Sequence, residues 1–128
     1  MAEETRTGGC LCGAVRFELD DEPFLIGACH CADCRKESCS AFTFYAKWPR
    51  AAFRVTGETR TYAGRDFCPA CGARLFNLHA EDVELRVGSL DEAPTTIGSP
   101  SQEGWIKRRE AWLAPIGGAG QSTEDTPR

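Results

Sequence analysis

The sequence predicts one mainly β domain that is held together by metal-binding knuckles. Two observations support this prediction. Short segments alternate apolar and polar residues with a period of two, as strands with one buried face do. Eight cysteines occur in 128 residues, and seven of them fall into three short clusters with the spacing of zinc ligands. A hydrophobic content of 41% is enough for a single modest core, which a bound metal would stabilise further.

The alternating segments define the expected strands. Val15, Phe17 and Leu19 alternate with charged residues, which predicts a strand with one buried face. The run after Pro23 is apolar throughout, so it predicts a buried strand that leads to Cys29. The complete set of expected strands is residues 15–19, 24–28, 39–45, 52–57, 59–62, 74–79 and 83–88.

Turn-forming residues predict how these strands are connected. Gly57 predicts a turn, around which we expect residues 52–57 and 59–62 to pair. Pro49 and its neighbours are expected to end the strand before them. The polar residues that follow Cys34 predict a short helical turn.

Composition divides the chain into three parts. Residues 1–7 are polar, and we expect them to be flexible. Residues 8–113 carry all the cysteines and all the expected strands, so they form the predicted zinc-binding domain. Residues 114–128 are rich in Gly, Ser, Thr and Pro, and we expect a disordered tail.

Charge and hydropathy restrict the partners and the compartment. The formal net charge of -4 argues against nucleic acid, because phosphate binding depends on clustered Lys and Arg. The sequence has no basic and apolar leader and no apolar run that could cross a bilayer, so we expect a cytoplasmic protein without membrane contact. Cytosolic thiols stay reduced, which favours metal binding over a disulfide framework.

The first metal-binding candidate is a turn with three thiols. Cys31 and Cys34 have the spacing at which one turn directs two sulfurs at the same ion, and Cys29 can supply a third from a strand end. Zinc prefers sulfur ligands and takes four of them in structural sites. Three protein ligands leave one position open, which is the arrangement of a catalytic zinc.

Two further pairs of thiols predict a second site. Cys10 and Cys12 are flanked by glycines, and Cys68 and Cys71 belong to a Cys-Pro-x-Cys-Gly knuckle. Together these four thiols would complete a structural Cys₄ site. An alternative is a zinc ribbon that joins Cys31 and Cys34 to the knuckle, but it leaves three cysteines without partners.

The sequence is compatible with more than one role for each of two residues near the triple-Cys turn. Cys39 can be a core residue, a fourth ligand or a redox partner, and we expect the core position. His30 lies between two ligands, so its ring should point away from their metal, and we expect it to support the site or to lie at the surface. Direct ligation by His30 is the alternative.

With these motifs in place, the sequence resembles the glutathione-dependent formaldehyde-activating enzymes, a family that includes centromere protein V-like proteins. The resemblance spans about residues 8–113. It is carried by the segment from Gly9 to Phe17, the segment from Cys29 to Lys36, and the knuckle from Phe67 to Gly72. The resemblance implies an Mss4-like fold, in which several coiled antiparallel sheets are stapled by two zinc ions.

The resemblance also implies an activity. The family's named reaction is a carbon–sulfur lyase reaction run backwards, in which glutathione and formaldehyde form S-hydroxymethylglutathione. Cys29, Cys31 and Cys34 would act through the open zinc site, with glutathione as co-substrate. Arg35 and Lys36 are possible contacts for the glutathione carboxylates. The partners are therefore expected to be a small thiol and a small aldehyde.

Three positions depart from the family's usual sequence. Thr96 stands where the family usually has His, Gln102 where it has Lys, and Cys39 where it commonly has Gly. All the ligand cysteines are present, so these departures do not affect the expected zinc binding. They affect the choice of substrate instead. Two other functions stay open at this point: a zinc-stabilised binding module without catalysis, and a thiol-redox or zinc-buffering protein.

Overall fold

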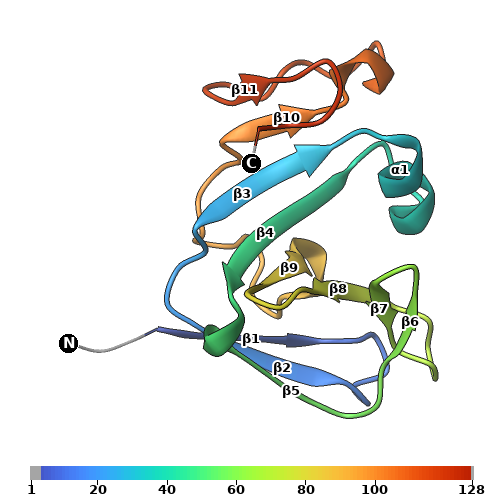
Figure 1. Cartoon of the computed structure of the whole chain (residues 1–128), viewed down its shortest axis with the longest axis vertical. Helices are drawn as coiled ribbons and strands as arrows, with labels where there is room; N and C mark the ends of the chain where they lie inside the picture. Colours follow the sequence, from blue (N-terminus) through green and yellow to red (C-terminus); the bar gives the residue numbers. More distant parts are fainter. Residues whose placement is uncertain (1–3, 128) are drawn as a thin grey trace.

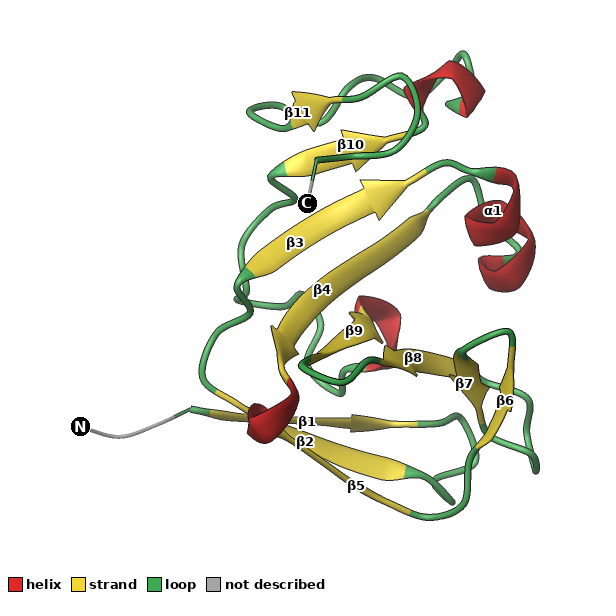
Figure 2. Ribbon diagram, in the orientation of Figure 1, coloured by secondary structure: helices red, strands yellow, loops and turns green. Residues whose placement is uncertain are grey.

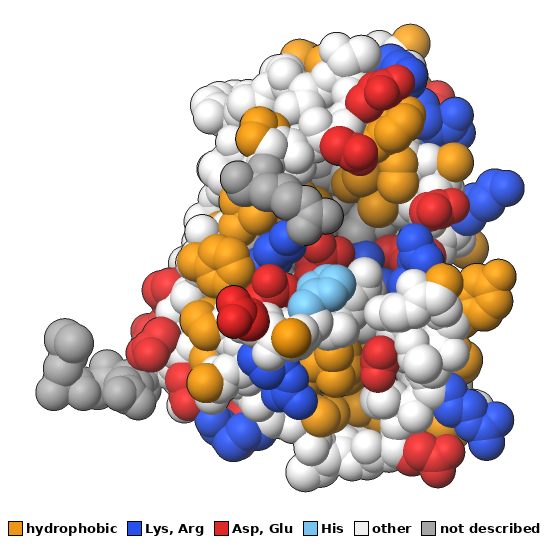
Figure 3. All heavy atoms as spheres, viewed as in Figure 1, with side chains coloured by type: hydrophobic (Ala, Val, Ile, Leu, Met, Phe, Trp, Pro, Cys, Tyr) orange, Lys and Arg blue, Asp and Glu red, His pale blue; other side chains and the backbone are white. Residues whose placement is uncertain are grey.

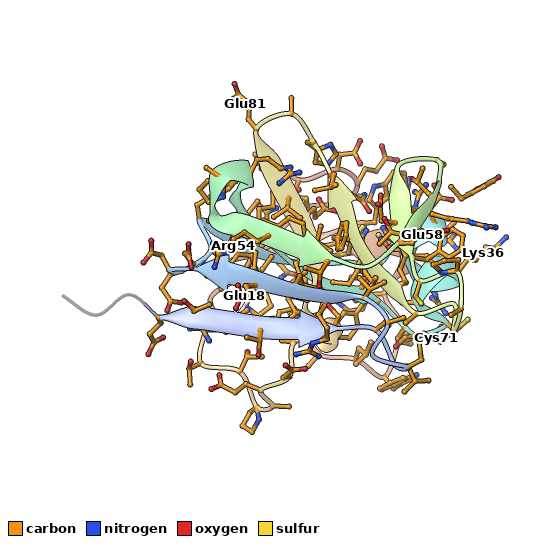
Figure 4. All side chains as sticks on the ribbon, turned by 90° about the horizontal axis from the view of Figure 1, so that it is seen from below. Glu18, Lys36, Arg54, Glu58, Cys71 and Glu81 are labelled. Atoms are coloured by element: carbon orange, nitrogen blue, oxygen red, sulfur yellow. The ribbon has the colours of Figure 1, made fainter. Side chains whose placement is uncertain are left out.

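Two β-sheets make up most of the structure, a computed structural model that describes residues 4–127 (Figure 1). The smaller sheet has the order β1-β2-β5 and is antiparallel throughout. Its strands are β1 (Thr5–Gly9), β2 (Arg16–Asp20) and β5 (Phe53–Thr56). Figure 4, which views this sheet from below, shows Arg54 beside Glu18 on its outer face. Polar side chains therefore cover the face of the small sheet that points away from the large one.

The larger sheet has eight strands in the order β11-β10-β3-β4-β9-β8-β7-β6. Most neighbours are antiparallel, as expected, and the exceptions are the parallel pairs that β10 forms with β3 and β11. The strands are β3 (Leu25–Cys29), β4 (Thr43–Pro49), β6 (Arg60–Tyr62), β7 (Arg65–Phe67), β8 (Arg74–Leu78), β9 (Asp82–Arg86), β10 (Gln102–Gly104) and β11 (Gly120–Gln121).

Helical structure is scarce in the described part of the chain (Figure 2). It comprises the α-helix α1 (Ala32–Ser38) and three single 3₁₀ turns: η1 (Arg50–Ala52), η2 (Val87–Ser89) and η3 (Ile106–Arg108). Within residues 4–127, no helix is both long and apolar enough to cross a membrane. The prediction of a mainly β fold is confirmed.

The core lies between the two sheets. Phe17 of β2, Phe53 of β5 and Phe76 of β8 bring their rings together, with centroid distances of 4.9 to 6.4 Å. Trp48 and Leu85 from the middle of the large sheet are fully buried in the same core. In β2 alternate residues face inward, so the period-two pattern of the sequence identifies the buried positions of this strand correctly.

One of the predicted connections differs in the structure. Residues 53–56 and 60–62 do not pair with each other: β5 pairs with β2 in the small sheet, and β6 pairs with β7 in the large one. Gly57 has a φ of 94°, and a side chain there would collide with the carbonyl oxygen of Ala14. It redirects the chain between the sheets instead of closing a hairpin.

Strand β4 is longer than expected and continues through Trp48 to Pro49. Trp48 is fully buried, and its indole N–H donates to the carbonyl of Asp21 at 3.1 Å. Burial of this large side chain outweighs the neighbouring proline. Pro49 is tolerated because it is the last residue of the strand.

Both ends of the described chain are more ordered than the sequence predicts. Thr5, Arg6 and Thr7 belong to β1, whereas we expected residues 1–7 to be flexible. Arg6 is buried, and it pairs with Glu22 at 2.7 Å. Residues 1–3 lie outside the described part.

The expected tail also contains structure. Gly120 and Gln121 form strand β11 and pair with β10, so residues 114–127 do not match the expected disordered tail. A buried carboxylate, that of Glu103, accepts hydrogen bonds from Ile116 and Gln121 of this segment. Composition could not reveal this partner, because it lies earlier in the chain. Residue 128 lies outside the described part.

Candidate metal centres

The first centre is formed by Cys10, Cys12, Cys68 and Cys71, whose sulfur atoms all lie within 4.8 Å of one another. The Cys10 and Cys12 sulfurs are 3.6 Å apart, and those of Cys12 and Cys68 are 3.8 Å apart. Tetrahedral zinc with bonds of about 2.3 Å requires sulfur–sulfur distances of about 3.8 Å. This donor set therefore fits zinc, and the alternative ribbon that joins the knuckle to Cys31 and Cys34 does not form.

The turn between β1 and β2 carries the first half of this centre. The N–H of Cys10 donates to the carbonyl of Val15 at 3.0 Å, and the N–H of Gly13 donates to that of Cys10 at 3.2 Å. These bonds close a tight loop, in which the N–H of Val15 also points at the Cys10 sulfur from 3.2 Å. A backbone donor of this kind stabilises a thiolate.

The knuckle between β7 and β8 carries the second half. The N–H of Gly72 donates to the carbonyl of Cys68 at 2.8 Å, and Gly72 has a φ of 78°, which glycine adopts without strain. The N–H of Cys71 points at the Cys68 sulfur from 3.5 Å. Cys68 itself is fully buried. Figure 4 shows Cys71 at the end of the molecule where the loops of the two sheets meet.

The four thiols of this centre differ in pKa. Burial alone would raise the pKa of Cys10, but the N–H of Val15 and the neighbouring thiols lower it to about 6. For Cys12 the N–H of Ala14 lowers the pKa, but its contacts with the other thiols raise it to about 11 overall. The N–H groups of Ala73 and Cys12 also lower the pKa of Cys71, so the thiols of this centre differ in how readily they ionise. A cation at the centre of the four sulfur atoms would stabilise their negative charge and allow all four thiols to ionise.

The second centre is the triple-Cys turn, where the sulfurs of Cys29, Cys31 and Cys34 lie within 4.8 Å of one another. Cys29 is the last residue of β3, Cys31 is the N-cap of α1, and Cys34 lies in the first turn of that helix. The N–H of Cys34 donates to the Cys31 sulfur at 3.3 Å. All three side chains are partly exposed, unlike the buried Cys68. The strand end and helix start predicted from the sequence thus deliver the three thiols.

Neutral thiols are strongly favoured in this turn. The hydrogen bond with Cys29 and then burial raise the pKa of Cys34 far above its ordinary value, although the nearby charge of Arg86 acts in the opposite direction. Burial also raises the pKa of Cys31. A soft cation such as zinc would lower the pKa values of these thiols and allow them to bind as thiolates.

His30 is buried, so a surface position is wrong. Its Nε2 lies 2.7 Å from Oε2 of Glu103, a side chain that is also fully buried. A ring that is bonded to Glu103 through Nε2 points away from the three sulfurs, and His30 is not part of their cluster. His30 therefore supports the turn and does not bind the metal through this nitrogen. Glu103 was missed, because a single acidic residue in a short strand gives no sequence signal.

Comparison with known proteins agrees with these centres. The family model of the glutathione-dependent formaldehyde-activating enzymes matches residues 5–108. The chain belongs to this family. A solved structure of a Rhodobacter sphaeroides protein has a similar fold, with a TM-score of 0.55 and 22% sequence identity over 73% of this chain and 96% of that chain. This likeness concerns the fold alone.

The possible substrate contacts suggested by the family resemblance differ in availability. Arg35 forms an ion pair with Glu110 and donates to the carbonyl of Arg108 at 3.0 Å, so it is engaged within the chain. Lys36 is exposed and projects from the molecule in Figure 4. Of the two residues, Lys36 is the one that can meet a ligand without breaking an ion pair.

The positions that depart from the family's usual sequence occupy different places. Cys39 is exposed at the C-cap of α1 with a φ of 50°, so the expected core position is wrong, and it is not among the clustered thiols. This left-handed conformation is one that glycine adopts more easily. Thr96 accepts a hydrogen bond from Arg6 at 3.0 Å, away from the triple-Cys turn.

A groove with a volume of about 800 Å³ lies on the large sheet, and none of the residues that line it belongs to the triple-Cys turn. Tyr45, Lys47 and Glu84 contribute to its floor, and Gln102 donates to the Tyr45 hydroxyl at 2.9 Å. In the pairing of β3 with β4, Tyr45 lies opposite Gly27 and Thr43 lies opposite Cys29. Alternate residues of a strand share one face, so Cys29 and the groove lie on the same face of the sheet. Figure 3 shows charged side chains of both signs gathered across the middle of this face of the molecule.

A second charged cluster lies between α1 and the sheet. Glu37 of α1 accepts hydrogen bonds from Arg65 at 2.8 Å, from Arg74 at 3.2 Å and from Arg86 at 2.7 Å. Burial would raise the pKa of Glu37, but the charges of Arg86 and Arg74 lower it overall. Glu37 therefore remains ionised and anchors α1, with Cys34 in its first turn and Cys31 at its N-cap, to the strands β7, β8 and β9.

Proposed function

We propose that this protein is a zinc-dependent enzyme that joins a small thiol, such as glutathione, to a small aldehyde, such as formaldehyde. One observation supports the proposal above all others: the triple-Cys turn has three clustered and partly exposed thiols, whereas the other centre has a complete set of four. A complete set suits a structural ion, and an incomplete one leaves room for a substrate. Membership of the family agrees with this division.

In the proposed reaction the thiol sulfur attacks the aldehyde carbon. A carbon–sulfur bond forms, the carbon–oxygen double bond becomes a single bond, and the proton of the thiol ends on the new hydroxyl group. The reverse reaction breaks the same carbon–sulfur bond, which makes the enzyme formally a lyase. No oxidant or reductant is consumed.

Two groups of cysteines would each bind one zinc ion. Cys10, Cys12, Cys68 and Cys71 would hold a structural ion, and Cys29, Cys31 and Cys34 would hold a second one. When bound there, the second ion supplies a Lewis acid that lowers the pKa of a substrate thiol. The N–H of Cys34 would stabilise the Cys31 thiolate. The groove at Tyr45 lies on the same face of the large sheet as Cys29, and it would give space for the rest of the thiol substrate.

The test is the rate at which glutathione and formaldehyde exchange with their adduct. Exchange NMR at equilibrium with ¹³C-formaldehyde measures this rate without a coupled enzyme. We expect the zinc-loaded protein to increase the exchange rate by at least about 100-fold over the uncatalysed rate at the same pH, the lower range of enzymatic acid–base effects. The Cys39→Ser variant is the matched control and should keep the full rate, because Cys39 is exposed and outside both clusters.

An unchanged exchange rate in the presence of protein with two bound zinc ions would contradict the proposal. The binding-module function would then be favoured. A rate increase that disappears in the Cys39→Ser variant would contradict the assignment of the reaction to Cys29, Cys31 and Cys34, because Cys39 would then be required for it.

A further inference from the structure

The chain beyond residue 108 lies outside the family match but makes contact with the triple-Cys turn. We name residues 109–127 the C-terminal segment. One contact is direct, an ion pair between Glu110 of the segment and Arg35 of α1, and a second connection passes through Glu103 of β10, whose side chain is only 2% exposed. The sequence analysis assigns residues 109–113 to the zinc-binding domain and the remainder of this segment to a disordered tail.

Glu103 collects hydrogen bonds from three parts of the C-terminal segment. Its Oε1 accepts from Nη2 of Arg109 at 3.1 Å, from the N–H of Ile116 at 3.0 Å and from Nε2 of Gln121 at 2.9 Å. Burial would raise the pKa of Glu103, but these donors and His30 lower it to about 2. A buried carboxylate is stable only when its oxygens are satisfied in this way.

The other oxygen of Glu103 holds His30. The 2.7 Å bond from Oε2 to Nε2 places the imidazole between the C-terminal segment and the turn, where it also packs on the Phe42 ring at a centroid distance of 5.3 Å. The backbone N–H of His30 donates to the carbonyl of Gly104 at 3.1 Å. Because Cys29 and Cys31 are the chain neighbours of His30, the orientation of its side chain restricts the directions of both thiols.

We infer that the C-terminal segment braces the triple-Cys turn through Glu103 and His30, and thereby fixes the positions of the three thiols. Glu103 and His30 are positioning residues in this inference, and the metal is held by the cysteines alone. The consequence for zinc rests on the proposed function, because it assumes a second ion at the turn. The brace itself concerns only the order of the turn.

The test weakens the far end of the brace in the full-length protein and leaves the turn untouched. The double variant Arg109→Met with Gln121→Ala removes two of the three donors to Glu103 from the C-terminal segment. The control is Lys107→Met with Glu124→Gln, which removes an ion pair between two exposed residues of the same region. The conservative variant Arg109→Lys keeps the charge beside Glu103. If the double variant folds poorly, Gln121→Ala alone is used, because Gln121 is exposed.

The first measurement is hydrogen exchange of the peptide that covers residues 29–35. We expect exchange about tenfold faster in the double variant, and no change in the peptide that covers the knuckle at residues 68–74. The second measurement is zinc release to a chelator. Release from the triple-Cys turn should become about 10- to 100-fold faster, while release from the four-Cys centre stays the same. Arg109→Lys should behave like the unmodified protein.

Equal exchange at residues 29–35 in the double variant and the control would overturn the brace. Equal acceleration at both peptides would overturn it as well, because it would show general destabilisation. A single zinc in the unmodified protein would instead contradict the proposed function, and the exchange measurement would still decide the brace.

Discussion

Replacing Cys68 with Ser should unfold the domain. Cys68 is fully buried, and its sulfur contacts that of Cys12 at 3.8 Å across the two halves of the four-Cys centre. Structural zinc contributes about 10–16 kcal/mol of apparent binding free energy in small domains. The whole stability of a domain is about 5–15 kcal/mol, so loss of this ion removes most of it. Thermal melting followed by circular dichroism should show no cooperative transition above room temperature.

The matched control for this prediction is Cys39→Ser. Cys39 is exposed, and its sulfur is outside both clusters. Its melting temperature should therefore stay within a few degrees of the unmodified protein, since exposed substitutions usually change stability by about 0.5 kcal/mol or less. A cooperative transition in Cys68→Ser at the temperature of this control would show that the four-Cys centre is not structural.

Replacing Cys31 with Ser should remove the second zinc and the exchange activity while the domain stays folded. Cys31 is the N-cap of α1, and serine is a favourable N-cap, so the helix keeps its start. The four-Cys centre shares no residue with the turn. We expect a zinc content of one per chain, an exchange rate at the uncatalysed level, and a melting temperature lowered by less than about 10 °C. Metal analysis, exchange NMR and thermal melting measure the three quantities on one preparation.

Equal losses of stability in Cys31→Ser and Cys68→Ser would contradict the division into a structural and a substrate-binding centre. Retention of the exchange rate in Cys31→Ser would contradict the assignment of the reaction to the turn. Because Ser preserves the helix cap, neither result could be attributed to the loss of α1.

The sequence predicts well the features that depend on local patterns. The alternation at Val15, Phe17 and Leu19 correctly identifies a strand and its buried face, because a one-residue shift would reverse the face. The spacing within each cysteine cluster likewise identifies the turns that gather the thiols. Ligand counting selects the pairing of the clusters that the structure adopts.

Features that depend on contacts distant in the chain could not be predicted in this way. The turn at Gly57 has local hairpin character, but the two strands that it joins pair with partners in different sheets. The tail has the composition of a disordered segment, and its order comes from Glu103. His30 has a definite role only because Glu103, 73 positions later in the sequence, lies beside it in space. Local propensity carries no information about such partners.

The most direct test of the central claim is a native mass spectrum of the freshly purified protein, recorded with and without glutathione. It counts the bound metal ions and detects capture of a thiol in one measurement. We expect two zinc ions per chain and a glutathione adduct that is absent from the Cys31→Ser variant. A single zinc ion and no adduct would contradict the account, and would leave a domain with only a structural metal.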